Sequence, residues 1–230
     1  MINCVLISDQ NKRITTALNS FGIKTAAVIA NTELDAPVCC HADCAALRIG
    51  DTLFCEKNNM QMLSKKGITS VPVEGVKSPY PSEVKLNAKV FGNSIFCNSN
   101  HIADEVRCFA NENGYSIIHC NQGYAACSTF KINDNAAITD DESVFKALSD
   151  NGVDCLLVSR GSVSLDGYDF GFIGGCGGMI SNDIAVFAGS LESHADGKRI
   201  IEFMNKFGVR TINLFDGSLI DFGGFVVLEE

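Results

Sequence analysis

The sequence predicts an α/β protein built from five units of the same order, strand, strand, helix, strand, arranged as a closed ring. Three observations predict this fold. A glycine follows an expected helix end five times, and a β-branched or aromatic residue comes next each time. The five glycines recur every 38 to 56 residues, a period typical of repeat architectures. A second marker, a glycine or Asn31, follows each of them by eight or nine residues. The five glycines are Gly22, Gly67, Gly114, Gly152 and Gly208.

A glycine suits each of these positions because the residue just past a helix end usually needs a left-handed backbone. Only glycine adopts that conformation without a clash at Cβ. Each of the five glycines therefore predicts where a helix ends and where an apolar strand begins.

The third unit is the clearest. Residues 129–132 and 136–139 are expected to form two short strands, joined by a turn of Asn and Asp residues. Asp140 and Asp141 can cap a helix that runs to about residue 151, since their carboxylates accept amide protons of its first turn. Residues 153–158 are apolar except for Asp154 and complete the unit as its third strand.

The same order predicts the other units. The expected strands are 45–49, 52–55 and 68–73 in the first unit, 86–91, 94–97 and 115–120 in the second, and 178–181, 184–188 and 209–214 in the fourth. The fifth unit is split: its first strand, 224–228, is at the carboxyl end, and its strands 4–7 and 25–29 are at the amino end. Pairing 224–228 with 4–7 closes the ring and removes the exposed edges that invite aggregation. We therefore expect one domain, residues 1–230, a five-bladed β/α propeller with pseudo-five-fold symmetry and neighbouring termini.

The composition favours a globular protein that binds neither membranes nor nucleic acid. Apolar residues make up 46% of the 230, which suffices for a core. No apolar run is long enough to span a bilayer, and residues 4–7 are too short for a secretion signal. Eleven cysteines without an export signal predict free thiols in a reducing cytoplasm. The net charge of −9 argues against nucleic acid and is compatible with a cationic small molecule.

The chemistry is expected where the chain enters each first strand, because these entries meet at one end of the ring. They contain a histidine, several carboxylates and three cysteines, in the segments 41–44, 82–85, 126–128, 175–177 and 221–223. The long segment 161–175 has little pattern and is expected to form a loop over the mouth of the ring.

At these positions the sequence resembles the pentein or guanidine-modifying-enzyme family, and in particular a bacterial branch of this fold. His41-Ala42-Asp43 resembles the family's histidine motif, the segment 123–129 its nucleophile loop, and Asp221 before Phe222-Gly223-Gly224 its acidic motif. The family includes arginine and agmatine deiminases, dimethylarginine hydrolase and amidinotransferases, together with a non-catalytic ribosome anti-association factor.

The sequence also departs from the family pattern. Asp221 follows the other two motifs instead of preceding them, as a shifted chain start in a ring would produce. Ala126 replaces the histidine that often precedes the nucleophile, and no arginine clearly matches the one that holds a substrate carboxylate.

The resemblance implies a cysteine-dependent hydrolase or transferase for a guanidino or related amidine compound, without a cofactor. Cys127 would attack the guanidinium carbon, His41 would act as acid and base, and Asp43 and Asp221 would bind the cation or set the histidine tautomer. Asp169, Tyr168 and Cys176 are further candidates for substrate binding.

Other interpretations stay open from the sequence. Cys127 is one of eleven cysteines and is equally consistent with a packing residue, and Cys176, among glycines, is a rival nucleophile. Cys39, Cys40, His41 and Cys44 together suggest zinc ligands, but adjacent cysteines are expected to point apart and no second pair completes four ligands. A non-catalytic ring that binds a small molecule or a macromolecule is the alternative of a different class, and the oligomeric state is open.

Overall fold

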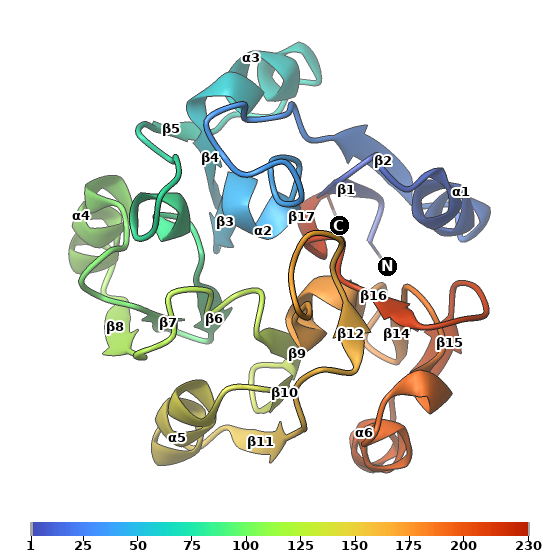
Figure 1. Ribbon diagram of the computed structural model, residues 1–230. Coiled ribbons are helices and arrows are strands. Elements are labelled where there is room, and N and C mark those ends of the chain that lie inside the picture. The colour runs from blue at the N-terminus through green and yellow to red at the C-terminus, as the bar shows by residue number, and fades with distance from the viewer. Residues whose placement is uncertain (1, 230) are drawn as a thin grey trace.

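The structure, a computed structural model, describes residues 2–229 and has the predicted α/β organisation. Among these residues are five three-stranded sheets of one design. In each sheet the middle strand pairs antiparallel with the strand that begins the unit and parallel with the strand that follows the helix. Figure 1 shows the five sheets around a common centre, with their helices at the periphery.

The bounds of the elements follow the predicted units closely. The first unit has β3 (Ala46–Ile49), β4 (Thr52–Glu56), α3 (Lys57–Lys65) and β5 (Val71–Val73). The second has β6 (Lys89–Phe91), β7 (Ser94–Cys97), α4 (Asp104–Glu112) and β8 (Ser116–His119). The third has β9 (Thr129–Asn133), β10 (Ala136–Thr139), α5 (Glu142–Asp150) and β11 (Asp154–Leu157). The fourth has β13 (Gly177–Met179), β14 (Ile184–Phe187), α6 (Gly197–Lys206) and β15 (Arg210–Asn213), and the split unit has β17 (Phe225–Glu229), β1 (Cys4–Ile7), α1 (Lys12–Ser20) and β2 (Lys24–Ala27).

The pairing of the last strand with the first is confirmed. β17 lies antiparallel to β1, with Val227 opposite Val5 and Phe225 opposite Ile7. The backbone amide of Asn3 also donates to the carbonyl of Glu229 at 2.9 Å. The carboxyl-terminal strand therefore completes the sheet of the amino-terminal unit.

The helices of the five units, which are α1, α3, α4, α5 and α6, end in the same way, at the glycine that the sequence singled out. Each of these glycines has a positive φ, between 72° and 81°. The amide of the residue after each glycine donates back to a carbonyl of the helix, as Val209 does to Met204 at 3.0 Å. This bond joins the sixth residue to the first, as in a Schellman motif. In four units the third strand begins later than predicted, since the motif occupies the residue after the glycine, whereas β2 begins at Lys24, one residue earlier than predicted.

Two other local predictions change. Asp141 alone caps α5, accepting from the amides of Ser143 and Val144, whereas the Asp140 carboxylate accepts from Ile173. The expected strand 86–91 begins only at Lys89, because a 3₁₀ turn at Ser82–Val84 and a further turn precede it.

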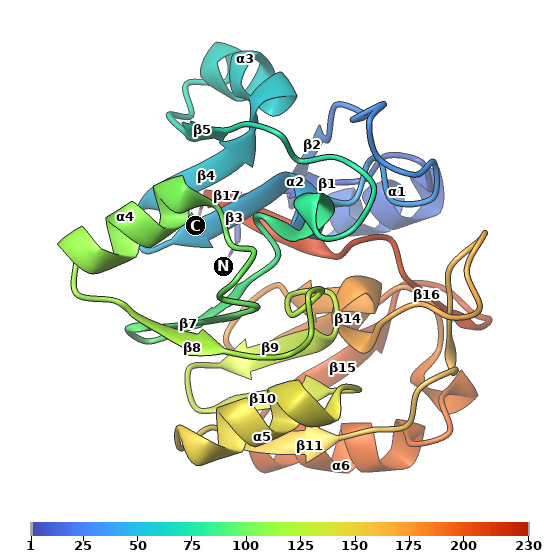
Figure 2. The same ribbon diagram turned by 60° about the vertical axis from the view of Figure 1, so that its left-hand side comes forward.

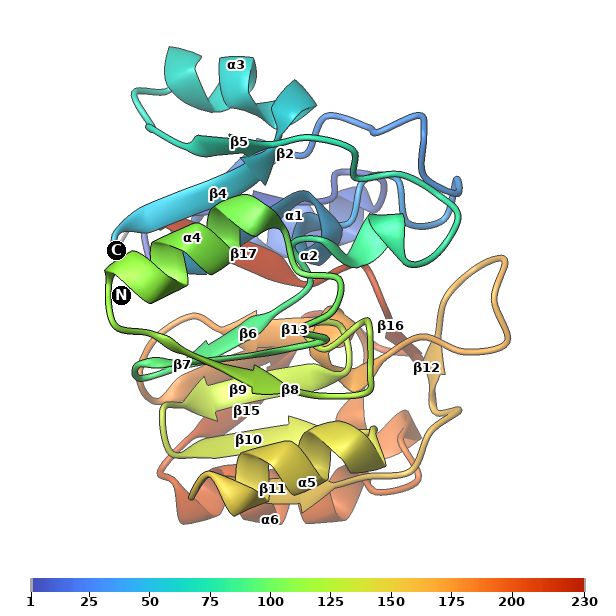
Figure 3. The same cartoon turned by 90° about the vertical axis from the view of Figure 1, so that its left-hand side faces the viewer.

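The segment 161–175 forms part of the mouth, as expected, but it is held by a small sheet that was not predicted. Strand β12 (Val163–Ser164) pairs in parallel with β16 (Leu219–Ile220). Figures 2 and 3 show this segment projecting from one side of the molecule, beyond the larger sheets. A two-residue strand has no readable periodicity, which is why the sequence did not indicate it.

Apolar side chains fill the core between the sheets and their helices and between neighbouring sheets. Phe130 of β9 and Phe187 of β14 stack with ring centroids 4.8 Å apart, between the third and fourth sheets. Within residues 2–229, no helix combines the length and apolarity required to cross a bilayer.

The repeated helix ends make a quantitative prediction. At each of the five glycines, an added Cβ would meet no atom within 4 Å. Only the left-handed backbone conformation therefore disfavours an alanine there. Each Gly→Ala substitution should therefore lower the free energy of unfolding by about 1 kcal/mol, by similar amounts in all five units. Urea unfolding measures this, with the exposed helical Glu112→Ala as a control expected to change stability by less than about 0.5 kcal/mol. A cost confined to one or two units would contradict an equivalent role for the five helix ends.

Candidate active site at the mouth of the ring

Several of the predicted entry segments lie together at one end of the five sheets. The short helix α2 (Ala42–Ala45) follows His41 and is joined to the acidic motif by a bond from the amide of Asp43 to the carbonyl of Gly223 at 3.2 Å. Gly174 packs so tightly on the nucleophile loop that an added Cβ would lie 2.6 Å from the carbonyl oxygen of Cys127. Segments far apart in the sequence are therefore neighbours here.

His41, Cys127 and Asp221 line one cavity of about 290 Å³. Its walls also include the aromatic ring of Tyr124, which stacks on Phe172 with centroids 6.0 Å apart. The hydroxyl of Tyr124 donates to the carboxylate of Glu83, which fixes this wall. The other lining residues are Val38, Cys44, Leu165, Tyr168, Asp169 and Phe170. We refer to this cavity as the mouth pocket.

Asp221 is buried and held by backbone amides. One carboxylate oxygen accepts from the amide of Phe172 and the other from the amide of Gly223, each at 2.9 Å. Gly171 and Gly175 allow this fit, because a Cβ on either would lie within 2.4 Å of the Asp221 side chain. Burial raises the pKa of Asp221 to about 6, against the opposing effect of His41.

His41 lies between two carboxylates. Its Nδ1 is 3.8 Å from Oδ1 of Asp221 and 4.0 Å from Oδ1 of Asp43. The imidazole rests on Gly223, where an added Cβ would come within 2.5 Å of the ring. Gly223, the first of the paired glycines, therefore has a steric reason: it lets His41 approach the backbone next to Asp221.

A residue that the sequence did not indicate, Asn87, joins the histidine segment to the nucleophile loop. Its side-chain oxygen accepts from the amides of Ala126 at 2.7 Å and Cys127 at 3.3 Å. Its side-chain nitrogen donates to the carbonyl of Asp43 at 3.2 Å and to the sulfur of Cys127 at 3.0 Å. Asn87 is fully buried, so these bonds have little competition from water. A lone asparagine between two predicted elements has no motif by which to recognise it.

Cys127 is buried beside a second thiol. Burial raises the pKa of the Cys127 thiol well above its usual value, and Cys44 and Asp43 raise it further. The ligand atoms of Asp43, Cys44 and Cys127 all lie within 4.8 Å of one another. Both sulfurs line the mouth pocket.

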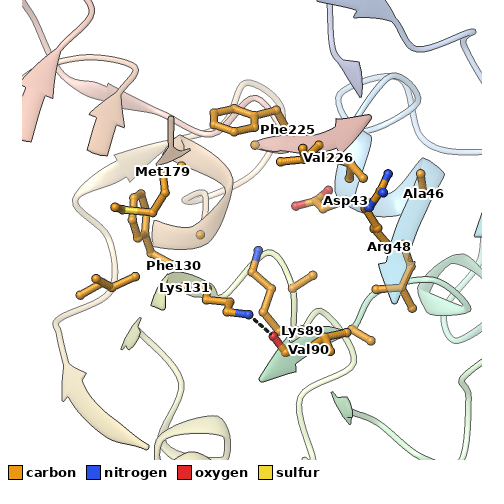
Figure 4. A pocket seen from close by; sticks show the side chains of 18 of the residues that line it. Asp43, Ala46, Arg48, Lys89, Val90, Phe130, Lys131, Met179, Phe225 and Val226 are labelled. Atoms are coloured by element: carbon orange, nitrogen blue, oxygen red, sulfur yellow. Dashed lines mark hydrogen bonds between the residues drawn. The ribbon is translucent and has the colours of Figure 1, made fainter. Parts of the chain in front are cut away.

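Asp43 faces a different space from the other candidates. It lines a second cavity, of about 580 Å³, between the inner strands β3, β6, β9, β13 and β17, which we call the axial cavity. Figure 4 shows the carboxylate of Asp43 and the ammonium of Lys89 both pointing into it. Burial lowers the pKa of Lys89, whereas the charges of Asp43 and Cys127 oppose that shift. Asp43 is buried, and neither of its carboxylate oxygens has a hydrogen-bond partner within residues 2–229.

The three predicted substrate-binding residues have different locations. Asp169 and Tyr168 line the mouth pocket, and the hydroxyl of Tyr168 donates to Asp35 at 3.2 Å. Cys176 does not line it: the side chain is fully buried in the core beneath the fourth sheet, and its thiol donates to the carbonyl of Ile173 at 2.9 Å. The sulfurs of Cys39 and Cys40 do not point apart as expected but lie 3.7 Å from one another.

Comparison with known proteins agrees with this architecture. The profile of the family described as "Family of unknown function (DUF6873)" matches residues 6–226, nearly the whole chain. The chain belongs to this family. No curated protein matches the sequence significantly.

Several solved structures are similar to the DUF6873 chain. The amidinotransferase SxtG of Microseira wollei, from the saxitoxin biosynthetic pathway, has a TM-score of 0.56 at 10% identity, covering 100% of this chain and 96% of its own. DDAH from Pseudomonas aeruginosa in complex with citrulline has a TM-score of 0.57 at 9% identity, covering 93% and 92%. C. jejuni agmatine deiminase has a TM-score of 0.53 at 11% identity, covering 93% and 87%. These similarities confirm the pentein fold, and at such identities they concern the fold alone.

The role of Asn87 leads to a stability prediction. Asn87→Ala leaves the buried amides of Ala126 and Cys127 without their acceptor, so it should lower the free energy of unfolding by roughly 2–4 kcal/mol. Asn87→Asp keeps an acceptor for both amides and should cost less than the alanine variant. Chemical denaturation compares the two with Asn93→Ala, an exposed hairpin residue, as the control. Equal, small losses for Asn87→Ala and Asn93→Ala would contradict the joining role.

Proposed function

We propose that this protein is a closed, five-bladed pentein enzyme: a cysteine-dependent hydrolase or transferase that acts on a guanidino or related amidine compound. The observation that carries the proposal is that Cys127, His41 and Asp221, which come from three different units, line one small cavity. The similar structures include an agmatine deiminase and two amidinotransferases. This supports the same general chemistry here.

The proposed reaction follows from the residue types. The thiolate of Cys127 attacks the central carbon of the guanidinium, forming a carbon–sulfur bond and a tetrahedral intermediate. The carbon–nitrogen bond then breaks, and the leaving amine takes a proton from His41. In a hydrolase, neutral His41 next removes a proton from water, which attacks the amidino-enzyme and releases the thiol. In a transferase, an acceptor amine replaces that water.

The carboxylates have separate proposed tasks. Asp221 lies 3.8 Å from Nδ1 of His41, close enough for a small adjustment to set the imidazole tautomer. Asp169 contributes negative charge to the mouth pocket and would attract a cation. Asp43 would act from the axial side, where its carboxylate can receive N–H groups of a guanidinium bound over Cys127.

The lining of the mouth pocket narrows the substrate class. Neither lysine nor arginine is among the described residues that line it, whereas two aspartates are. A substrate carboxylate would therefore meet no cation in the pocket. The volume, about 290 Å³, lies near the small end of the roughly 300–1,000 Å³ usual for ligand pockets. We therefore propose a small guanidino cation without a carboxylate.

The alternative, a non-catalytic protein that binds a small molecule or a macromolecular partner, uses the same pocket without covalent chemistry. Burial and the raised pKa of the Cys127 thiol are the observations that favour it, because a packing cysteine would share both properties. The acidic net charge of −9 suits a cationic ligand under both proposals and disfavours nucleic acid.

Thiol reactivity distinguishes the two proposals. A cationic alkylator such as 2-chloroacetamidine should label Cys127 at least about tenfold faster than the exposed Cys108, because the pocket binds the cation beside the sulfur. His41→Ala should slow this labelling, and Cys108→Ser should leave it unchanged. Peptide mass spectrometry over a time course gives the rate at each cysteine. Slow labelling of Cys127, with or without His41, would favour the binding protein.

A substrate screen tests the proposed class directly. Release of ammonia and of ureido products should be detected with agmatine-type compounds and should be weaker with arginine and methylated arginines, which carry a carboxylate. Cys127→Ser should abolish the activity, because serine is a much weaker nucleophile at this position. A clear preference for arginine would contradict the specificity inferred from the lining, and turnover by Cys127→Ser would contradict the mechanism.

A further inference from the structure

We propose that Asp43, Cys44 and Cys127 form a binding site for a thiophilic divalent cation of the Zn²⁺ class. This inference does not depend on the proposed enzymatic function. It begins from a feature that guanidine chemistry does not require, a second buried thiol beside the candidate nucleophile.

The three donors are already gathered. Their ligand atoms, a carboxylate oxygen and two sulfurs, all lie within 4.8 Å of one another. Two sulfurs bound tetrahedrally to zinc at about 2.3 Å are roughly 3.8 Å apart. A contraction of about 1 Å or less, within reach of side-chain rotation, would therefore bring the donors to bonding distance. Two thiolates and a carboxylate are ligands that suit zinc.

The carboxylate of Asp43 is an independent indication of a missing directly bound partner. Asp43 is only 7% exposed, and both of its carboxylate oxygens lack a hydrogen bond within the described part of the chain. A buried carboxylate in such a state is costly unless a cation or a donor meets it. Asp221, by contrast, is satisfied by two backbone amides. The unmet acceptor is therefore the one next to the two sulfurs.

Asn87 prepares the sulfurs as ligands. Its side-chain nitrogen donates to Cys127 at 3.0 Å and is 3.8 Å from the sulfur of Cys44. Hydrogen bonds from amides to ligating atoms commonly orient metal ligands and stabilise their charged form. Because the oxygen of Asn87 is held by two backbone amides, the direction of these N–H groups is fixed.

The local charges also balance. Each thiol gives up its proton to solvent as its bond to the metal forms, so two thiolates and one carboxylate carry three negative charges. A divalent cation leaves one negative charge. The ammonium of Lys89, which points into the axial cavity toward Asp43, can offset that remainder (Figure 4).

The geometry leaves one position of the metal open to the mouth pocket, since Cys44 and Cys127 both line it. Three protein ligands with an open fourth position are typical of zinc sites that bind water or a ligand. Metal binding and covalent chemistry would compete, because both use the sulfur of Cys127.

Cobalt substitution provides the test. The reduced full-length protein, titrated with Co²⁺, should develop thiolate-to-cobalt charge-transfer absorption and tetrahedral visible bands, saturating at one ion per chain. Zn²⁺ should displace the cobalt. Cys44→Ser and the isosteric Asp43→Asn should each weaken binding by at least about 100-fold, more than the loss of a supporting residue usually costs. Circular dichroism confirms that each variant is folded.

Matched cysteine variants decide which thiols bind. Cys40→Ser and Cys108→Ser should bind cobalt as the unaltered protein does, because neither sulfur belongs to the cluster. Loss of binding in Cys40→Ser would assign the metal to the Cys39–Cys40 segment and overturn the proposal. So would absence of the cobalt spectrum, or full binding by folded Cys44→Ser. The cobalt spectrum tests the metal site, and the alkylation rate of Cys127 tests the enzymatic function. Cobalt binding together with slow alkylation of Cys127 would therefore refute only the enzymatic function.

Discussion

The antiparallel pairing of β17 with β1 is the constraint on which the candidate site depends. This pairing fixes the start of β17, and with it the preceding Asp221 and Gly223, beside α2. The amide of Asp43 bonds to the carbonyl of Gly223, and Arg48 of β3 donates to the carbonyl of Leu228 at 3.1 Å. The carboxyl-terminal strand therefore belongs to the amino-terminal sheet and also touches the first unit. Without it, the imidazole of His41 would lose both its packing surface and one of its two carboxylates.

A second set of contacts places the sulfur relative to the histidine. Asn87 connects α2 to the loop of Cys127 through bonds to both backbones, and its burial makes each bond costly to break. The two sets of contacts differ in kind. The acidic motif is positioned by glycines that permit close approach, whereas the nucleophile loop is positioned by one amide side chain that fills two acceptor and two donor roles. Both leave little freedom for the groups at the pocket.

The sequence predicted the units because their helix ends are fixed by local chemistry. Gly114 and its four counterparts must adopt positive φ, and this requirement shows in the sequence without any tertiary information. The location of His41, Cys127 and Asp221 around one pocket followed from the ring and the family resemblance. The contribution of Asn87, the orientation of Asp43 toward the axial cavity and the nearness of Cys44 to Cys127 could not be foreseen. Each depends on how a turn of only a few residues directs a side chain between units, and no periodicity records that.

Cys127 lines the mouth pocket, and its sulfur lies within 4.8 Å of a carboxylate oxygen of Asp43, which lines the axial cavity. Asp221 and Asp169 contribute carboxylates to the mouth pocket, and Asp43 and Lys89 bring opposite charges to the axial cavity (Figure 4). A buried thiol in such surroundings has a raised pKa, and it stays unreactive until a nearby positive charge favours the thiolate. In the proposed reaction a guanidinium would deliver that charge from the mouth pocket and be consumed, whereas the proposed metal ion would deliver it within the donor cluster and remain. Cys44 shifts the balance toward the metal, because a single thiolate and a carboxylate would hold a divalent ion far less firmly than two thiolates do.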